Sequence, residues 1–250
     1  AVILPHDIEL PEVKDSKKIS EKKRERLYDE INDAALAVGV GIVHEEEIDE
    51  KNILQGTYQA MRQSIGQLSV KPDILLVDGN KADIKHYEQE SIIDGDQKSL
   101  SIAAASIIAK VTRDRMMRQY DIVFPQYGFA KHKGYGTKQH MEALKKFKAT
   151  PIHRKSFRPV KENMPNIRWL KSSKLVGKLG EQLVALKYLN DGYQIIKMNH
   201  TCSHYGEINI ITEKNGQLIF IEVKTATKDQ KPGPDLNVGQ SKLQKLKSAI

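Results

Sequence analysis

The sequence has almost no cysteine and no long hydrophobic run. Cys202 is the single cysteine, so no disulfide can form within the chain, and a reducing cytoplasm fits this composition. The longest weakly polar stretch, Ile102–Ala109, is far too short to span a bilayer. The N-terminal residues Ala1–Pro5 lack the basic flank and small-residue cleavage site of a signal peptide. With 29% charged residues and a mean hydropathy of −0.51, the chain is expected to be soluble, cytoplasmic and not membrane-bound.

Positive charge is concentrated in one part of the chain. The net charge is +8, and residues 129–160 contain nine Lys or Arg residues against the single Glu142, with aromatic and histidine side chains interleaved. A solvated helix face explains the lysines at 145, 146 and 148. It explains Lys131–Tyr135 less well, because charges in a Gly-containing loop add nothing to helix stability. This pattern therefore favours binding to nucleic acid.

A short apolar run ends at Asp78. Ile74–Val77 is entered from Pro72 and left through Gly79 and Asn80, which predicts a strand buried on both faces. A carboxylate at the C-terminal end of a buried strand is desolvated enough to bind a cation while it still reaches a crevice. An ordinary Asp-Gly turn explains Asp78 equally well.

A second carboxylate, Asp96, favours the metal interpretation. The β-branched run Ser91–Ile93 leads into an Asp-rich turn that places Asp96 18 residues after Asp78. This spacing leaves room for one loop and a neighbouring strand, so both carboxylates would reach the same edge of a sheet. Such an oxygen-only site suits Mg²⁺ or Mn²⁺ and not zinc. The small residues that follow, including three consecutive alanines, predict a helix that lies close to the sheet and is capped by Ser99 or Ser101.

Several motifs in this order resemble those of ribonuclease HII, over roughly residues 1–160. They are Asp15–Lys18, Val77–Asn80, Gly95–Asp96, Ser101–Asp114, His132–Thr137 and Pro151–Arg154. The resemblance implies a ribonuclease H-like α/β domain, a mixed sheet with flanking helices. It also implies endonucleolytic cleavage of the RNA strand of RNA–DNA hybrids, and cleavage 5′ to ribonucleotides embedded in duplex DNA. The implied cofactors are two Mg²⁺ or Mn²⁺ ions at the scissile phosphate.

The same resemblance assigns roles to individual residues. It makes Asp78 and Asp96 the metal ligands of one catalytic site. Residue type alone predicts that Tyr135 packs in the core, but the family's tyrosine in this motif reads the ribonucleotide at the RNA–DNA junction. Lys17, Lys18 and Lys133 are expected to bind the nucleic-acid backbone.

One part of the family pattern has no counterpart in this sequence. Ribonucleases HII carry a first strand with an Asp-Glu pair and a Gly-Arg-Gly turn. Both lie just before the position that corresponds to Ala1 of this sequence. The chain is therefore expected to be an N-terminally truncated form. Since two carboxylates hold a pair of divalent ions poorly, a catalytically impaired nucleic-acid-binding fragment is the alternative function.

A different pattern follows residues 161–173, which have no clean periodicity and predict a linker. A helix is expected from Gly177 until Asp191, and then three strands, of which the last two are joined by a tight turn at Asn215–Gly216. Residues 174–250 resemble the YraN-like family, whose fold is similar to that of restriction endonucleases. The matching motifs are Gly180–Glu181, Gly206–Asn209 and Phe220–Lys224.

The second resemblance implies a further candidate site of Glu181, Asn209, Glu222 and Lys224. Side chains two apart on a strand share a face, so Lys224 can lie beside Glu222 and stabilise a phosphate. The family's usual residue at position 209 is Asp, and a neutral amide there weakens binding of a divalent metal. A nuclease that acts through this region is the third possibility, and Asn209 counts against it.

The predicted organisation is a ribonuclease HII-like domain at 1–160, a linker at 161–173 and a C-terminally incomplete YraN-like domain at 174–250. We expect a monomer.

Overall fold

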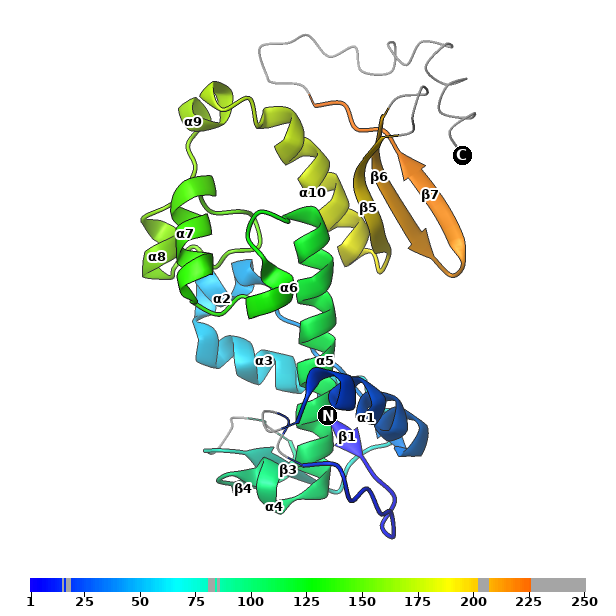
Figure 1. Ribbon diagram of the computed structural model, residues 1–250. Helices are drawn as coiled ribbons and strands as arrows, with labels where there is room; N and C mark the ends of the chain where they lie inside the picture. The colour runs from blue at the N-terminus through cyan, green and yellow to red at the C-terminus, as the bar shows by residue number, and fades with distance from the viewer. Residues whose placement is uncertain (15, 17–18, 81–83, 85, 202–206, 226–250) are drawn as a thin grey trace. The chain divides into compact units, whose positions relative to one another are not determined.

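The computed structural model describes residues 1–14, 16, 19–80, 84, 86–201 and 207–225 (Figure 1). It divides into two compact units, Ala1–Arg115 with Ile152–Arg158 and Met116–Pro151 with Pro159–Ile250. The division falls within the long helix α5 (Leu100–Val123). The predicted linker contains a short helix, α9 (Ile167–Ser172). Among the described residues, no helix is both long and apolar enough to cross a membrane.

Two pairs of strands belong to the first unit. Strands β1 (Val2–Ile3) and β2 (Ala37–Val38) pair antiparallel, and β3 (Ile74–Asp78) and β4 (Glu88–Ile92) pair parallel. In the parallel pair Asp78 is aligned with Ile92. The prediction of a strand beside β3 is confirmed, although β4 begins three residues before the predicted start at Ser91.

The prediction that Ile74–Val77 is buried on both faces was wrong. Leu75 and Val77 are buried, whereas Ile74 and Leu76 are 43% and 38% exposed. The buried face packs on Ile65 of α3 (Ile53–Gly66) and on Ile84. Burial alternates along the strand because, in the described part of the chain, a helix packs on one face of this two-stranded sheet and not on the other.

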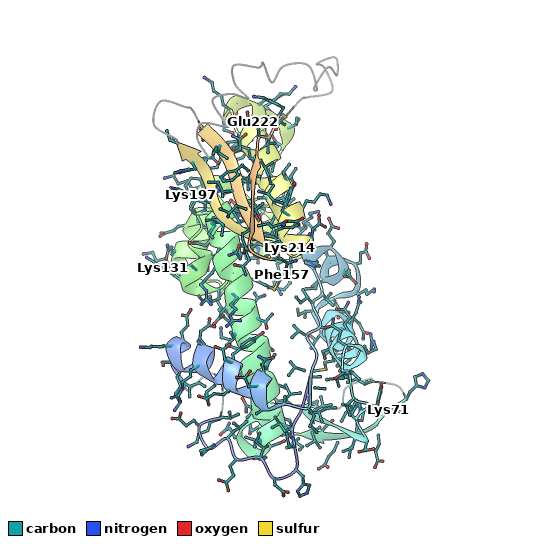
Figure 2. The ribbon with its side chains drawn as sticks, turned by 90° about the vertical axis from the view of Figure 1, so that its right-hand side faces the viewer. Lys71, Lys131, Phe157, Lys197, Lys214 and Glu222 are labelled. Carbon is teal, nitrogen blue, oxygen red and sulfur yellow. The ribbon has the colours of Figure 1, made fainter. Side chains whose placement is uncertain are left out.

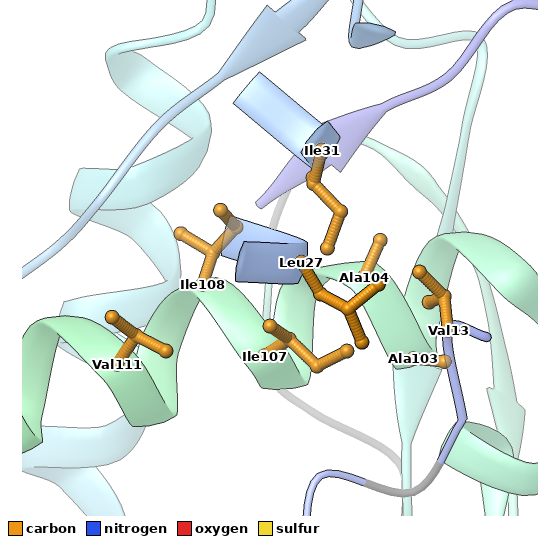
Figure 3. Packing of buried hydrophobic residues seen from close by; sticks show 8 residues of the cluster. All are labelled: Val13, Leu27, Ile31, Ala103, Ala104, Ile107, Ile108 and Val111. Atoms are coloured by element: carbon orange, nitrogen blue, oxygen red, sulfur yellow. The ribbon is translucent and has the colours of Figure 1, made fainter. Parts of the chain in front are cut away.

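The main core of the first unit lies between α1 (Glu21–Ala34) and α5 (Figure 3). As predicted, Ser20 caps α1 and accepts a hydrogen bond from the N–H of Lys23 at 3.3 Å. The small side chains of Ala103 and Ala104 are buried against the apolar stripe of α1, so the two helices approach closely. The eight buried residues drawn in Figure 3 are Val13, Leu27, Ile31, Ala103, Ala104, Ile107, Ile108 and Val111.

The remaining helices are short, apart from α7 and α10. They are α2 (Glu45–Lys51), α4 (Gly95–Lys98), α6 (Phe129–His132), α7 (Lys138–Phe147), α8 (Arg158–Lys161) and α10 (Val176–Asn190).

A three-stranded antiparallel sheet completes the second unit, in the order β5 (Gln194–Thr201), β6 (Glu207–Lys214) and β7 (Gln217–Ile221). Asn215 and Gly216 both have positive φ and join β6 to β7, so the predicted hairpin is confirmed. The Gln182 amide of α10 donates to the carbonyl of Val123 at 3.2 Å, and the N–H of Ile195 donates to Gln119 at 2.8 Å. These bonds join the C-terminal part of α5 to α10 and β5 within the second unit.

Candidate active site and nucleic-acid contacts

The structure brings Asp78 and Asp96 together through the residue that precedes Asp96. Asp78 is the exposed last residue of β3, and its Oδ1 accepts a hydrogen bond from the N–H of Gly95 at 2.8 Å. Asp94 lies in the left-handed region with φ of 54°, and α4 starts at the next residue. The backbone of Gly95 therefore contacts the Asp78 carboxylate, and the next residue, Asp96, is 8% exposed.

Glycine at position 95 favours this close approach. A Cβ atom there would lie 2.6 Å from Cδ1 of Ile102 and 3.2 Å from Oδ1 of Asp78. A larger residue would push the Asp78 carboxylate away from the start of α4. The Gly-Asp motif thus contributes a close backbone approach as well as a carboxylate.

The two carboxylates match the donor chemistry of Mg²⁺ or Mn²⁺ but are few in number. Among the described residues, no group of three or more His, Cys, Asp or Glu side chains is arranged to hold a metal ion. Asp114 is not a replacement ligand, because its buried carboxylate forms ion pairs with Lys110 at 2.6 Å and with Arg24 at 3.5 Å. Asp78 and Asp96 would therefore hold divalent ions with an incomplete set of protein ligands.

The residues predicted to contact nucleic acid differ in how exposed they are. Tyr135 is 64% exposed, in contrast to the core packing that residue type alone predicts. Lys133 is 7% exposed, and its Nζ donates to the carbonyl of Ala130 at 2.6 Å. Both belong to the second unit, whereas Asp78 and Asp96 belong to the first. Lys17 and Lys18 lie outside the described residues.

The second candidate site is assembled from a helix and two neighbouring chain segments. Glu181 of α10 accepts a hydrogen bond at Oε1 from the amide of Asn209, at 3.3 Å. The Asn209 oxygen accepts from the N–H of Val223 at 2.8 Å. Directly after β7, Lys224 forms an ion pair with Glu222 at 3.0 Å, as their spacing predicts. Figure 2 shows Glu222 and Lys214 at opposite ends of the three-stranded sheet.

The Glu181 carboxylate accepts hydrogen bonds from neutral amide groups. A site for a divalent metal would instead need further anionic oxygens beside it. Asn209 donates to Oε1, and Asn199, which sequence reasoning did not identify, donates to Oε2 at 3.1 Å. These N–H groups occupy lone pairs of Glu181 that a divalent cation would otherwise use. The residues present at this second site therefore do not fit a divalent metal.

Two family models match separate parts of this chain. The family model described as ribonuclease HII matches residues 4–160. The chain belongs to the ribonuclease HII family. A second model, described as uncharacterised protein family UPF0102, matches residues 180–250, which confirms the YraN-like resemblance. The predicted α/β fold class is confirmed as well.

Individual ribonucleases HII are similar over the same region. That of Acetivibrio thermocellus is 57% identical over 157 residues, which are 63% of this chain and 61% of the relative. That of Geobacter metallireducens is 55% identical over 164 residues, 66% of this chain and 77% of the relative. The crystal structure of ribonuclease H2 from Pyrococcus horikoshii superposes with a TM-score of 0.54 and 25% identity, covering 60% of this chain and 79% of that one. The chain thus spans about three fifths of the Acetivibrio enzyme.

Proposed function

We propose that this chain is a metal-dependent endonuclease of the ribonuclease HII type. Its substrates would be the RNA strand of RNA–DNA hybrids and ribonucleotides embedded in duplex DNA, cut on their 5′ side, in the cytoplasm. The observation that carries the proposal is the pairing of Asp78 with the Gly95–Asp96 turn at the carboxyl ends of parallel strands. This edge of a sheet is where α/β proteins place their ligands.

The proposed metal site of the first unit and the proposed substrate contacts of the second unit have separate physical roles. Asp78 and Asp96 would hold divalent ions, which when bound would supply an activated water and positive charge to stabilise the leaving 3′-oxygen. Gly95 fixes the separation of the two carboxylates. The exposed ring of Tyr135 packs on the sugar of the ribonucleotide, and exposed lysines such as Lys138 and Lys145, rather than the buried Lys133, bind the phosphate backbone.

The direct test is cleavage of a duplex that contains one ribonucleotide, with Mg²⁺ or Mn²⁺, and mapping of the product ends. A cut 5′ to the ribonucleotide, with an all-DNA duplex left intact, supports the proposal. Equal cutting of both duplexes contradicts it and points to the second candidate site.

A catalytically impaired nucleic-acid-binding protein is the second candidate function. The observation in its favour is that no group of three or more His, Cys, Asp or Glu side chains among the described residues could hold a metal ion. Tight binding of a hybrid without cleavage in either metal would support this alternative.

We expect binding to an RNA–DNA hybrid to weaken steeply with salt. Lys138 and Lys145 are exposed and lie seven residues apart, hence on one face of α7. Neutralising phosphates releases counterions, so the double variant Lys138→Gln/Lys145→Gln should reduce the slope of log affinity against log salt by about 2. Anisotropy titrations at several salt concentrations measure the slope. Lys197→Gln on β5 is the control, and an affinity that hardly changes with salt would contradict the prediction.

A further inference from the structure

Tyr135 presents an exposed ring on a main chain that is held on both sides. Its N–H donates to the carbonyl of His132 at 2.8 Å. Its own carbonyl accepts from the N–H of Thr137 at 2.8 Å and from Nδ1–H of His140 at 3.0 Å. Gly134, with φ of 82°, makes the sharp turn that precedes it. The Cα of Tyr135 is therefore fixed while its ring stays accessible.

His140 is itself held by the start of α7. The side chain of Thr137 caps this helix and accepts from the N–H of His140 at 3.3 Å. From this position the imidazole extends back to the carbonyl of Tyr135. His140 is 5% exposed, so its ring is enclosed by protein.

His132 supports the same loop from the other side. Its Nε2–H donates to the carbonyl of Tyr127 at 2.8 Å, and its Nδ1 accepts from the N–H of Gly134 at 3.2 Å. This arrangement requires a neutral ring, because a protonated Nδ1 cannot accept a hydrogen bond. The rings of His132 and His140 stack with centroids 4.5 Å apart and an interplanar angle of 11°.

Aromatic side chains enclose this histidine pair. Phe129 packs edge-on against His132 and His140, at 5.7 Å and 5.4 Å between centroids. Tyr127 stacks on Phe129 at 5.2 Å. Burial lowers the pKa of His140, partly opposed by its backbone hydrogen bond with Tyr135. The two imidazoles therefore have little freedom to rotate.

Core packing alone would not explain where the polar atoms of the two rings are directed. His132 and His140 bond backbone groups of the two consecutive residues Gly134 and Tyr135. We infer that His132 and His140 are positioning residues, which hold the main chain of Tyr135 so that its ring can discriminate a ribonucleotide-containing duplex from DNA. This inference rests on the proposed function, because it assumes that Tyr135 contacts the substrate.

The test compares two amide replacements of His140 in the full chain. The side-chain N–H of Asn reproduces the position of Nδ1, whereas that of Gln reaches the position of Nε2. Affinities for a duplex with one ribonucleotide and for the same all-DNA duplex give a discrimination ratio. We expect Tyr135→Ala to lower this ratio by about 5- to 150-fold, the range for one stacked base. His140→Asn should keep most of the ratio, and His140→Gln should lose most of what Tyr135→Ala loses.

Hydrogen exchange of residues 133–137 provides a second measurement that does not depend on the substrate. Exchange should accelerate in His140→Gln and not in His140→Asn, with His6→Ala as a control at an exposed histidine. Equal ratios and equal exchange in the two amide variants would overturn the positioning role while leaving that of Tyr135 intact. An unchanged ratio in Tyr135→Ala would overturn ribonucleotide sensing itself, and this inference with it.

Discussion

An added N-terminal strand with an adjacent Asp-Glu pair should raise the rate at which this chain cleaves a ribonucleotide-containing duplex by at least about 100-fold, since metal-ion stabilisation contributes several kcal/mol. Two close Mg²⁺ ions bring four positive charges. Asp78 and Asp96 supply two negative charges and the scissile phosphate one more, so the site as described is under-liganded. The 250-residue chain alone is accordingly expected to make the same cut, but slowly.

Matched variants of the extended chain test whether this activity depends on the proposed site. Asp78→Asn should abolish the gain, because it removes a metal ligand while preserving the shape of the side chain. Asp73→Asn makes the same change just before β3, at the opposite end of that strand, and should leave the rate unchanged. Fast cleavage by the unextended chain would contradict the charge argument. Asp94, exposed beside Gly95, would then be the first replacement ligand to mutate.

Asn209→Asp should create a metal site in the second unit that the natural residue prevents. The substitution removes a hydrogen-bond donor from Glu181 and places two carboxylates side by side, about 3 Å apart, where they repel each other until a cation binds. At about 100 times its Kd, Mn²⁺ would stabilise the variant by about 2.7 kcal/mol. For a chain of this size that is a rise in Tm of about 5–10 °C.

The measurement is thermal unfolding with and without Mn²⁺, in an Asp78→Asn background that disables the first site. The same chain with Asn209 should show little shift. Asn215→Asp is the matched control, because it makes the same chemical change in the β6–β7 turn, where Asp is also tolerated at positive φ. If the chain with Asn209 instead binds Mn²⁺ and cuts DNA, and Glu222→Ala abolishes that cutting, our interpretation of Asn209 is wrong.

Local signals in the sequence were sufficient for several features of this protein. The Ser20 cap of α1 and the Asn215–Gly216 hairpin depend on backbone preferences of a few neighbouring residues. The proximity of Asp78 to the Gly95–Asp96 turn also followed from the sequence, which placed each at the end of a strand. Because the two neighbouring strands are parallel, their carboxyl ends lie at the same edge of the sheet. The family resemblance itself depends on motifs of this local kind.

Other features depend on contacts between segments that are distant in the sequence. The exposure of Ile74 and Leu76 was decided by which faces of the sheet receive helices, and a hydrophobic run cannot report that. The burial of Lys133 and the histidine contacts to Tyr135 arise where a loop folds onto α7. The amide donors around Glu181 come from β5 and β6, so Asn199 carried no signal in the sequence. The sequence by itself determined the family and the residue types of its sites. Tertiary packing decided which polar atoms face each other. The physical reason is that a hydrogen bond needs its two atoms within about 3 Å, and spacing along the sequence does not set that distance.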